Sequence, residues 1–340
     1  MKYIFFVIIP IIVALMSCKK ESDIIEDHFF VENNGATMPV LVKGNLEPEV
    51  IVLFLHGGPG GNASQASFLP AFKELETNYA IAYWDQRASG LSQGNPDKTT
   101  FTVEQFVEDL DIVVQALQAR YSNAKIFLFG HSWGGALGSA YLSTGSYQDK
   151  ITGFICMNSG HNLEVGLPLS VDWVENYANQ QISQNNNTSY WNEVYSWCTT
   201  NPDMTIADNY FKYVEYLKET DAYHHDNQDV NTGTVSGGDV LNSHMSLAIF
   251  VGGGYLSQNF NILELNLSSE MNDINIPALV IWGEHDGVNT LDMGYDAFNS
   301  IGTNPAQKEM IILNNSAHEG YLEEPEIFKS SLINFVEAYK

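Results

Sequence analysis

The stretch KIFLFGHSWGGALGSAYLS, residues 125–143, is an apolar run followed by Gly130-His131-Ser132-Trp133-Gly134-Gly135 and then by a helix-like segment. A glycine-x-serine-x-glycine pattern between a buried strand and a helix is typical of a sharp turn. Such a turn exposes the serine hydroxyl at the carboxyl end of a sheet. The helix that follows points its N–H groups at any negative charge that develops there. The stretch therefore predicts that Ser132 is a nucleophile.

A nucleophilic serine needs a base, and the base needs an acid that orients it. His318 follows the last apolar run of the chain, and Asp286 follows the apolar run Ala278–Trp282. Both residues therefore fall at the same predicted sheet edge as Ser132, in the chain order serine, aspartate, histidine. We predict a catalytic triad of these three residues, with Glu284 as the alternative acid. The alternative for His318 is an ordinary surface-loop histidine.

A second glycine-rich loop, His56-Gly57-Gly58-Pro59-Gly60-Gly61, follows the apolar run Val50–Leu55. Glycines let a backbone approach a ligand closely, and the proline stiffens the turn. We predict that the backbone N–H groups of Gly58 and Trp133 form an oxyanion hole. The loop lacks the glycine spacing and the lysine of phosphate-binding loops, which argues against a nucleotide site.

Short apolar runs alternate with amphipathic stretches along most of the chain, and the clearest amphipathic stretch covers residues 103–121. This alternation predicts a mostly parallel sheet with helices on both faces. The alternation breaks near residue 161 and resumes after residue 269, which indicates an insertion rather than a separate linked domain. We therefore expect a core formed by residues 28–160 and 270–340, and a cap inserted at residues 161–269.

Three motifs resemble those of one protein family: His56–Gly60, the segment WDQRASGLS at residues 84–92, and Gly130–Gly135. Through them the chain resembles the α/β-hydrolases, and among these the proline iminopeptidase-like serine peptidases. The resemblance covers the two expected core segments. It implies an α/β fold with an eight-stranded sheet, a mainly helical cap, and no cofactor or metal. It also implies that Asp85 and Arg87 brace loops near the site, and Ala88 departs from the usual glycine there.

The inserted segment is strongly acidic, because residues 164–264 hold 13 Asp and Glu, two Lys and no Arg, a net charge of −11. Such a field favours cationic substrates, and a merely solvated acidic surface is the alternative. Proline iminopeptidases hold the substrate ammonium with cap glutamates, but Gly252–Leu256 stands here where the family usually has a Glu-x-His segment. The candidate substrate-binding residues are Glu164 first, then Glu193 and Glu215.

The composition of the chain limits its partners. Its 340 residues include 15 Lys+Arg and 41 Asp+Glu, so the formal net charge is −26, which excludes a basic nucleic-acid-binding face. The hydrophobic content of 44% supplies a packed core and excludes disorder. The three cysteines cannot form a disulfide scaffold, and their spacing matches no zinc site. We expect a small-molecule or short-peptide substrate.

The first eighteen residues resemble a bacterial lipoprotein signal. An apolar run from Tyr3 to Leu15 is too short to span a bilayer but suits a signal peptide, and it ends in Leu15-Met16-Ser17-Cys18. We expect a signal peptide at residues 1–17, lipidation of Cys18 and a polar tether at residues 18–27. The mature protein would then be exported and lipid-anchored in the bacterial cell envelope. A plain secretory signal with a chance cysteine is the alternative.

Three functions remain open from the sequence. The first is an aminopeptidase of the proline iminopeptidase type that acts on short peptides through an acyl-enzyme. The second is a carboxylesterase or another acyl hydrolase with the same triad. The third is a non-catalytic binding protein on a hydrolase scaffold, against which the complete set of Ser132, Asp286 and His318 argues.

Overall fold

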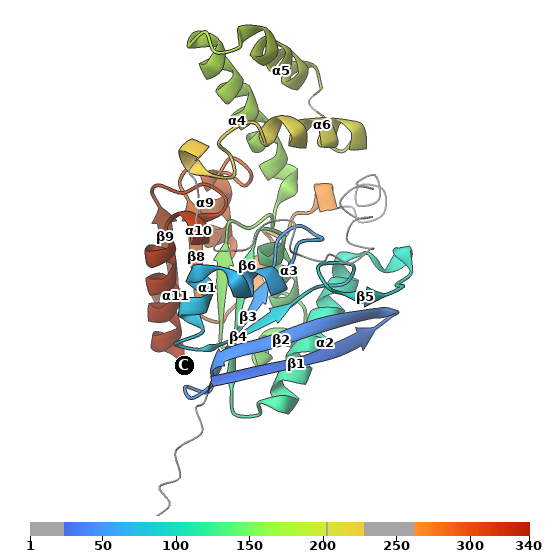
Figure 1. Cartoon of the computed structure of the whole chain (residues 1–340), viewed down its shortest axis with the longest axis vertical. Helices are drawn as coiled ribbons and strands as arrows, with labels where there is room; N and C mark the ends of the chain where they lie inside the picture. Colours follow the sequence, from blue (N-terminus) through green and yellow to red (C-terminus); the bar gives the residue numbers. More distant parts are fainter. Residues whose placement is uncertain (1–23, 202, 228–261) are drawn as a thin grey trace, which may run out of the picture.

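The computed structural model describes residues 24–201, 203–227 and 262–340, in which one mixed β-sheet is flanked by helices (Figure 1). The strands are β1 (Ile24–Asn33), β2 (Ala36–Asn45), β3 (Val50–Leu55), β4 (Ala80–Trp84), β5 (Gln93–Gly94), β6 (Lys125–His131), β7 (Gly153–Met157), β8 (Ala278–Gly283) and β9 (Lys308–Leu313). They pair in the order β1-β2-β4-β3-β6-β7-β8-β9, with β5 beside β2. The pairs from β4 through β9 are parallel, and β1 and β2 form an antiparallel edge.

The mostly parallel sheet is confirmed, but the expected number of strands needs a correction. Eight strands form the continuous path, and β5 adds a ninth within the described residues. This extra strand is two exposed residues that pair with Ala36 and Thr37 of β2. Because two residues cannot show an alternating pattern, the sequence gives no sign of β5.

The boundary of the expected tether is also corrected. Strand β1 begins at Ile24, so residues 24–27 belong to the sheet rather than to a tether. Asp27 anchors this end of the strand, because its carboxylate accepts hydrogen bonds from the Arg120 guanidinium and the Tyr121 hydroxyl. The expected signal peptide, Cys18 and the first part of the expected tether lie outside the described residues. Among the described helices, none is both long and apolar enough to cross a bilayer.

Helices cover both faces of the sheet. The helices are α1 (Pro70–Leu75), α2 (Val103–Arg120), α3 (Trp133–Leu142), α4 (Leu163–Ser183), α5 (Thr188–Thr200), α6 (Ala207–Leu217), α9 (Leu291–Ser300), α10 (Gly320–Glu323) and α11 (Pro325–Tyr339). Buried residues of α2, α3 and α9 share one apolar core with Ile51, Leu53 and Leu55 of β3. Buried residues of α1 and α11 share the opposite core with the alternate β3 residues Val50, Val52 and Phe54. The unbroken apolar run of β3 therefore reflects burial on both faces.

The inserted segment forms a helical cap. Helices α4, α5 and α6 stand beyond one end of the sheet, away from the β1–β2 hairpin (Figure 1). Helix α4 starts after β7, where the Asn162 side chain accepts a hydrogen bond from the Val165 N–H. A bridge between Asn162 and Asn266 joins the two ends of the insertion. The cap therefore leaves and re-enters the core at neighbouring points.

The loop after β4 is held by Asp85, which is fully buried. Its carboxylate accepts hydrogen bonds from the N–H groups of Ala63, Ser64 and Leu91, at 2.8–2.9 Å, and from the Ser64 hydroxyl. Ala88 adopts a φ of 51°, which explains why a glycine would fit there. Asp85 thus ties three loop segments together, as the resemblance implied.

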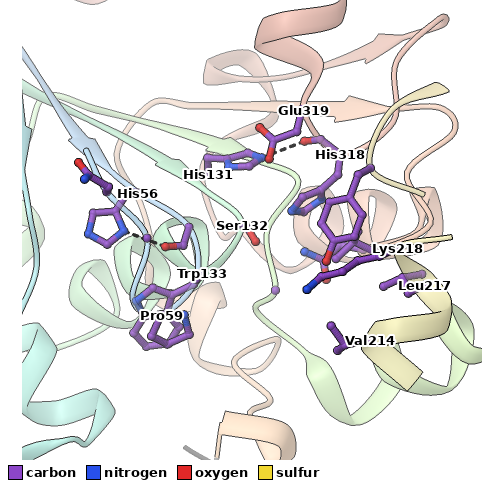
Figure 2. Close-up of a pocket in the computed structure, with 18 of the residues that line it drawn as sticks. His56, Pro59, His131, Ser132, Trp133, Val214, Leu217, Lys218, His318 and Glu319 are labelled. Atoms are coloured by element: carbon purple, nitrogen blue, oxygen red, sulfur yellow. Dashed lines mark hydrogen bonds between the residues drawn. The ribbon is translucent and has the colours of Figure 1, made fainter. Parts of the chain in front are cut away.

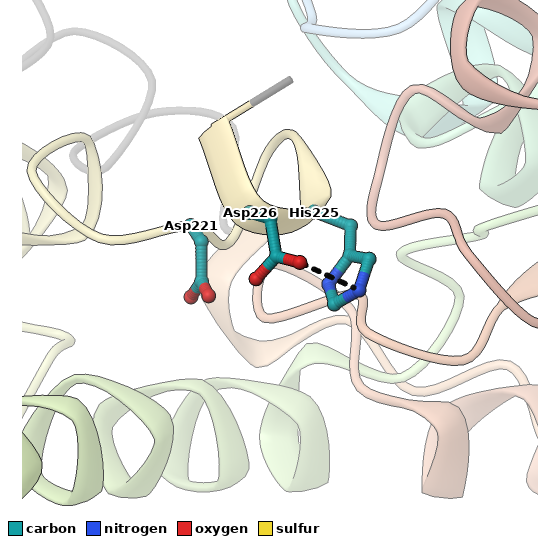
Figure 3. Close-up of side chains that lie close together, drawn as sticks. All are labelled: Asp221, His225 and Asp226. Atoms are coloured by element: carbon teal, nitrogen blue, oxygen red, sulfur yellow. Dashed lines mark ion pairs between the residues drawn. The ribbon is translucent and has the colours of Figure 1, made fainter.

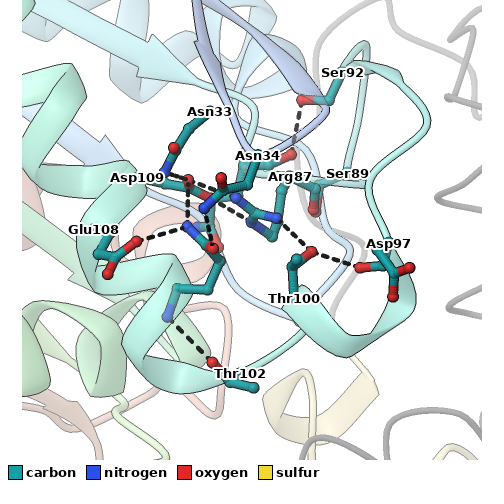
Figure 4. Close-up of polar contacts among 12 residues, drawn as sticks. Asn33, Asn34, Arg87, Ser89, Ser92, Asp97, Thr100, Thr102, Glu108 and Asp109 are labelled. Carbon is teal, nitrogen blue, oxygen red and sulfur yellow. Dashed lines mark hydrogen bonds and ion pairs between the residues drawn. The ribbon is translucent and has the colours of Figure 1, made fainter.

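Arg87 forms a buried ion pair with Asp109 of α2, and both side chains are inaccessible to solvent. The guanidinium donates to both oxygens of Asp109 and to the Thr100 hydroxyl, while Asn33 of β1 donates to Asp109 Oδ1 at 2.8 Å (Figure 4). Because Arg87 also donates to Thr100 and Asp109 also accepts from Asn33, these contacts hold the β1–β2 turn, α2 and the loop after β4 together.

We expect Asp109→Asn to destabilise the fold by about 3–5 kcal/mol, because it leaves the Arg87 guanidinium buried without a counter-charge. The matched control is Glu108→Gln, which removes the same charge one residue away from an exposed side chain and should cost well under about 1 kcal/mol. Urea denaturation measures both. Equal losses of stability in the two variants would contradict this role of the ion pair.

Candidate active site

Ser132 lies on a strained turn between β6 and α3. Its φ is 56° and its ψ is −122°, a backbone conformation that residues with a side chain rarely adopt. The turn is possible because glycines flank it. A Cβ on Gly134 would lie 1.9 Å from the Leu55 carbonyl oxygen, and one on Gly130 would lie 2.4 Å from the Gly134 oxygen. The glycines let the helix start against β3, and this close packing holds Ser132 at the sheet edge.

His318 and Asp286 are brought together as the sequence predicted. His318 Nδ1 lies 2.9 Å from Asp286 Oδ2, and both residues are buried. The other carboxylate oxygen, Oδ1, accepts hydrogen bonds from the N–H groups of Val288 and Asn289 at 2.8 and 2.9 Å. The Asn158 side chain also donates to Oδ2. These hydrogen bonds fix Asp286 as the acceptor that orients the His318 ring.

The electrostatic surroundings favour the charged form of His318. Burial alone lowers the pKa of its imidazole, but the Asp286 carboxylate outweighs burial through its attraction and its hydrogen bond. With smaller contributions from Glu319 and Glu323, the pKa of His318 rises above the ordinary histidine value. In this environment the His318 imidazole can accept a proton during a reaction, because the Asp286 carboxylate stabilises the imidazolium that forms.

The competing residues of the sequence analysis occupy other positions. Glu284 is exposed, while its backbone N–H donates to the Leu313 oxygen. His285 Nε2 lies 3.1 Å from the Asn314 oxygen. His131 Nε2 lies 2.9 Å from the His318 backbone oxygen, so its ring supports the loop that carries His318 (Figure 2). Asp286 is thus the acid that contacts His318.

The loop after β3 lies against the serine. A Cβ on Gly57 would lie 3.1 Å from Ser132 Cβ, and Gly58 has a φ of 121°, which favours glycine. The Gly58–Pro59 peptide bond is cis. Gly58, Ser132 and Trp133 line one cavity. This arrangement places the two predicted donors on the two backbone segments that border Ser132.

Gln86 links these two segments, a role that sequence analysis missed. Its backbone N–H donates to His56 Nε2 at 3.2 Å and its side-chain amide donates to the His56 oxygen, while its Oε1 accepts from Trp133 Nε1 at 2.9 Å. Because Nε2 accepts, His56 Nδ1 carries the proton and donates to the Gly57 oxygen at 2.8 Å. The WDQR motif was the available signal, and it places Gln86 directly after Asp85.

Ser132 and His318 open into a cavity of about 1080 Å³ between core and cap (Figure 2). Its lining is largely apolar and aromatic, and the cap contributes mostly residues of α6 and of the segment that follows it. The described cap residues on the lining include Tyr210, Tyr213, Val214, Leu217 and Tyr223. The Tyr223 ring packs edge-on against His318, with centroids 5.9 Å apart. The cavity is large enough for a short peptide or a comparable small molecule.

The predicted cap carboxylates are not gathered at this cavity. Glu164 is exposed and accepts a hydrogen bond from Asn266, and Glu193 is exposed on α5. Neither is among the described residues that line the cavity, so the structure does not bring these two candidates to Ser132. Glu215 does line it, but its side chain is 68% exposed and pairs with Lys212. Their helices turn these carboxylates toward solvent, where they need no buried partner. Gly252–Leu256 lies outside the described residues.

Glu319 is the cavity carboxylate that sequence analysis missed. It directly follows His318 in the chain. The predicted substrate-binding carboxylates all belong to the acidic insertion, whereas Glu319 belongs to the core. Its position beside the predicted base was the signal that could have found it.

Asp221, His225 and Asp226 could offer three ligand atoms to a cation, because these atoms lie within 4.8 Å of one another (Figure 3). The Asp226 side chain is 78% exposed and lies 3.5 Å from His225 Nε2. The His225 ring stacks on His285 with centroids 3.7 Å apart. Asp221 Oδ1 and His225 Nδ1 are buried without a hydrogen-bond partner among the described residues.

Comparisons with known proteins agree with this architecture. Residues 50–325 match the family described as alpha/beta hydrolase fold. The chain is 26% identical over 305 residues to the probable aminopeptidase YbaC of Bacillus subtilis, covering 86% of this chain and 91% of that protein. It is 24% identical over 304 residues to a proline iminopeptidase of Thermoplasma volcanium, covering 84% and 88%. The crystal structure of a Mycobacterium smegmatis proline iminopeptidase superposes with a TM-score of 0.63 at 18% identity, covering 92% and 98%.

We expect the His318 imidazole to titrate above the ordinary histidine pKa of about 6.5 and to shift to lower pH in Asp286→Asn, because the carboxylate stabilises the imidazolium. Histidine NMR resonances followed against pH, with His318 assigned by its loss in His318→Gln, measure the shift. The control Glu284→Gln should leave the titration in place. A larger shift in the control than in Asp286→Asn would reverse the assignment of the acid.

Proposed function

The chain belongs to the alpha/beta hydrolase fold family, and on that premise we propose that it is a serine hydrolase that forms an acyl-enzyme at Ser132. The observation that carries the proposal is the 2.9 Å contact between His318 Nδ1 and Asp286, at the cavity that Ser132 lines. A proton held on Nδ1 by the carboxylate leaves Nε2 as the base. That tautomer is the one a serine nucleophile requires.

In the proposed reaction, Ser132 Oγ attacks the carbonyl carbon of the substrate while His318 Nε2 takes the hydroxyl proton. Asp286 stabilises the imidazolium that forms. The N–H groups of Gly58 and Trp133 donate hydrogen bonds to the oxyanion of the tetrahedral intermediate. His318 then gives its proton to the leaving amine or alcohol. Water, activated by the same imidazole, hydrolyses the acyl-enzyme and restores the Ser132 hydroxyl.

For the substrate, we propose short peptides from which the enzyme releases the amino-terminal residue. Relatives named as a probable aminopeptidase and as proline iminopeptidases, matched over most of their length, support this class. The acidic cap supports it further, because a negative field attracts a peptide amine.

An esterase acting on uncharged acyl groups is the second candidate. The largely apolar lining of the cavity favours it, as does the position of Glu164 and Glu193 away from that lining. The leaving group and the charge next to the scissile bond distinguish the two candidates, since an aminopeptidase requires a free amine there and an esterase does not.

The test compares kcat/KM for alanyl and prolyl p-nitroanilides, the same amides with acetylated amines, and short-chain p-nitrophenyl esters. We expect a preference for the free amine over the acetylated amide. Ser132→Ala should lower kcat by on the order of 10⁴ or more on every substrate, whereas Ser330→Ala, an exposed serine of α11, should not. Normal turnover by Ser132→Ala would refute the serine mechanism. Hydrolysis of esters alone would favour the second candidate.

A further inference from the structure

Glu319 is a carboxylate in the wall of the cavity that the proposed mechanism does not use. It follows His318 directly, and its side chain extends beside His131 (Figure 2). The Tyr321 hydroxyl hydrogen-bonds to the carboxylate. Its Oε2 atom, however, is buried without a hydrogen-bond partner among the described residues. A buried acceptor left unpaired is costly unless a ligand supplies the donor.

The carboxyl group of Glu319 is ionised at neutral pH. Burial raises its pKa, but the neighbouring His131 and His318 and the Tyr321 hydroxyl outweigh burial and lower it. Burial also lowers the pKa of His131 and His224, which favours the neutral form of both rings. In the neutral form in which His318 acts as a base, its ring offers Glu319 no full positive charge.

No lysine or arginine of the described residues forms an ion pair with Glu319. Glu215, the other described carboxylate on the lining, already pairs with Lys212 at 3.0 Å. A buried carboxylate without a partner cation attracts one much more strongly than an exposed, paired carboxylate does. Among the described cavity residues, Glu319 is thus the stronger position for a cationic ligand.

The chemistry of the proposed substrate sets where such a cation must be. In an amino-terminal residue the α-nitrogen is separated from the scissile carbonyl carbon by one atom, a distance of about 2.5 Å. The receptor for this ammonium must therefore reach into the cavity close to the triad. Glu319 adjoins His318 in the chain and lines the same cavity as Ser132, so it meets this requirement.

We propose that Glu319 is the specificity-determining receptor for the α-ammonium group of the substrate, with Oε2 accepting one of its N–H donors. This assignment rests on the proposed aminopeptidase function. It gives the core, rather than the acidic cap, the role of recognising the free amine. The net charge of the cap then acts on the approach of the substrate and not on its final position.

The test is Glu319→Gln, which keeps the shape of the side chain and removes its charge. We expect kcat/KM for alanyl p-nitroanilide to fall about 30-fold or more, mainly through KM, because a buried charge pair loses one partner. Hydrolysis of an uncharged p-nitrophenyl ester should fall much less than hydrolysis of the amide, because Glu319 affects the ester only through its smaller contribution to the pKa of His318. The matched control Glu326→Gln removes the same charge from an exposed side chain on α11 and should change neither rate.

The outcomes separate this proposal from the alternatives. If Glu319→Gln lowers kcat/KM equally for the amide and for the ester, Glu319 positions the triad and is not the ammonium receptor. Loss of the amine preference in Glu215→Gln instead would assign the receptor to the cap. If wild type hydrolyses free and acetylated amides equally, no ammonium receptor exists.

A binding measurement keeps the proposal testable even if catalysis is absent. Calorimetry of alanine amide with Ser132→Ala, and with Ser132→Ala combined with Glu319→Gln, measures recognition without turnover. We expect binding only by the first protein, and acetylated alanine amide should bind neither. Equal binding by both proteins would overturn the role of Glu319, whereas loss of activity in Ser132→Ala bears only on the proposed function.

Discussion

The structure depends on one steric constraint, the close packing of the turn at Ser132 against β3. Gly134 approaches the Leu55 oxygen so closely that a methyl group has no room, and the serine between strand and helix keeps a φ of 56°. This strain persists because the neighbouring strands and α3 over-determine the turn. The same packing brings the Gly57–Gly58 loop against the serine, so the nucleophile and the proposed oxyanion donors depend on one contact.

Much of the architecture could be predicted because parallel strands end at a common edge. Asp286 and His318 directly follow β8 and β9, so their proximity follows from topology even though 32 residues separate them. Residues 24–27 and β5 were missed because exposed edge strands show little apolar pattern. Gln86 was missed because its role depends on two segments that meet only in the folded chain.

The acidic cap shows why net charge locates a site poorly. The net charge of −11 for residues 164–264 led to the prediction that cap carboxylates line the cavity. In the structure, however, Glu164 and Glu193 are exposed, and Glu215 pairs with Lys212. What distinguishes a binding carboxylate is desolvation without a partner, and sequence does not reveal burial. The Oε2 atom of Glu319 has that property, although Glu319 belongs to the core and follows a residue that was already assigned. The net charge of −11 thus lies in the cap, whereas the proposed recognition of the substrate amine lies in the core.

The central claim is that the strained turn, His318 and Asp286 make Ser132 a nucleophile. The most direct measurement is mass spectrometry of the protein after treatment with a fluorophosphonate, followed by peptide mapping. We expect one covalent adduct, on Ser132, that forms much more slowly in Asp286→Asn and is absent in Ser132→Ala. An adduct on another residue, or labelling that is equally fast in Asp286→Asn, would contradict the assignment of Ser132 as the activated nucleophile.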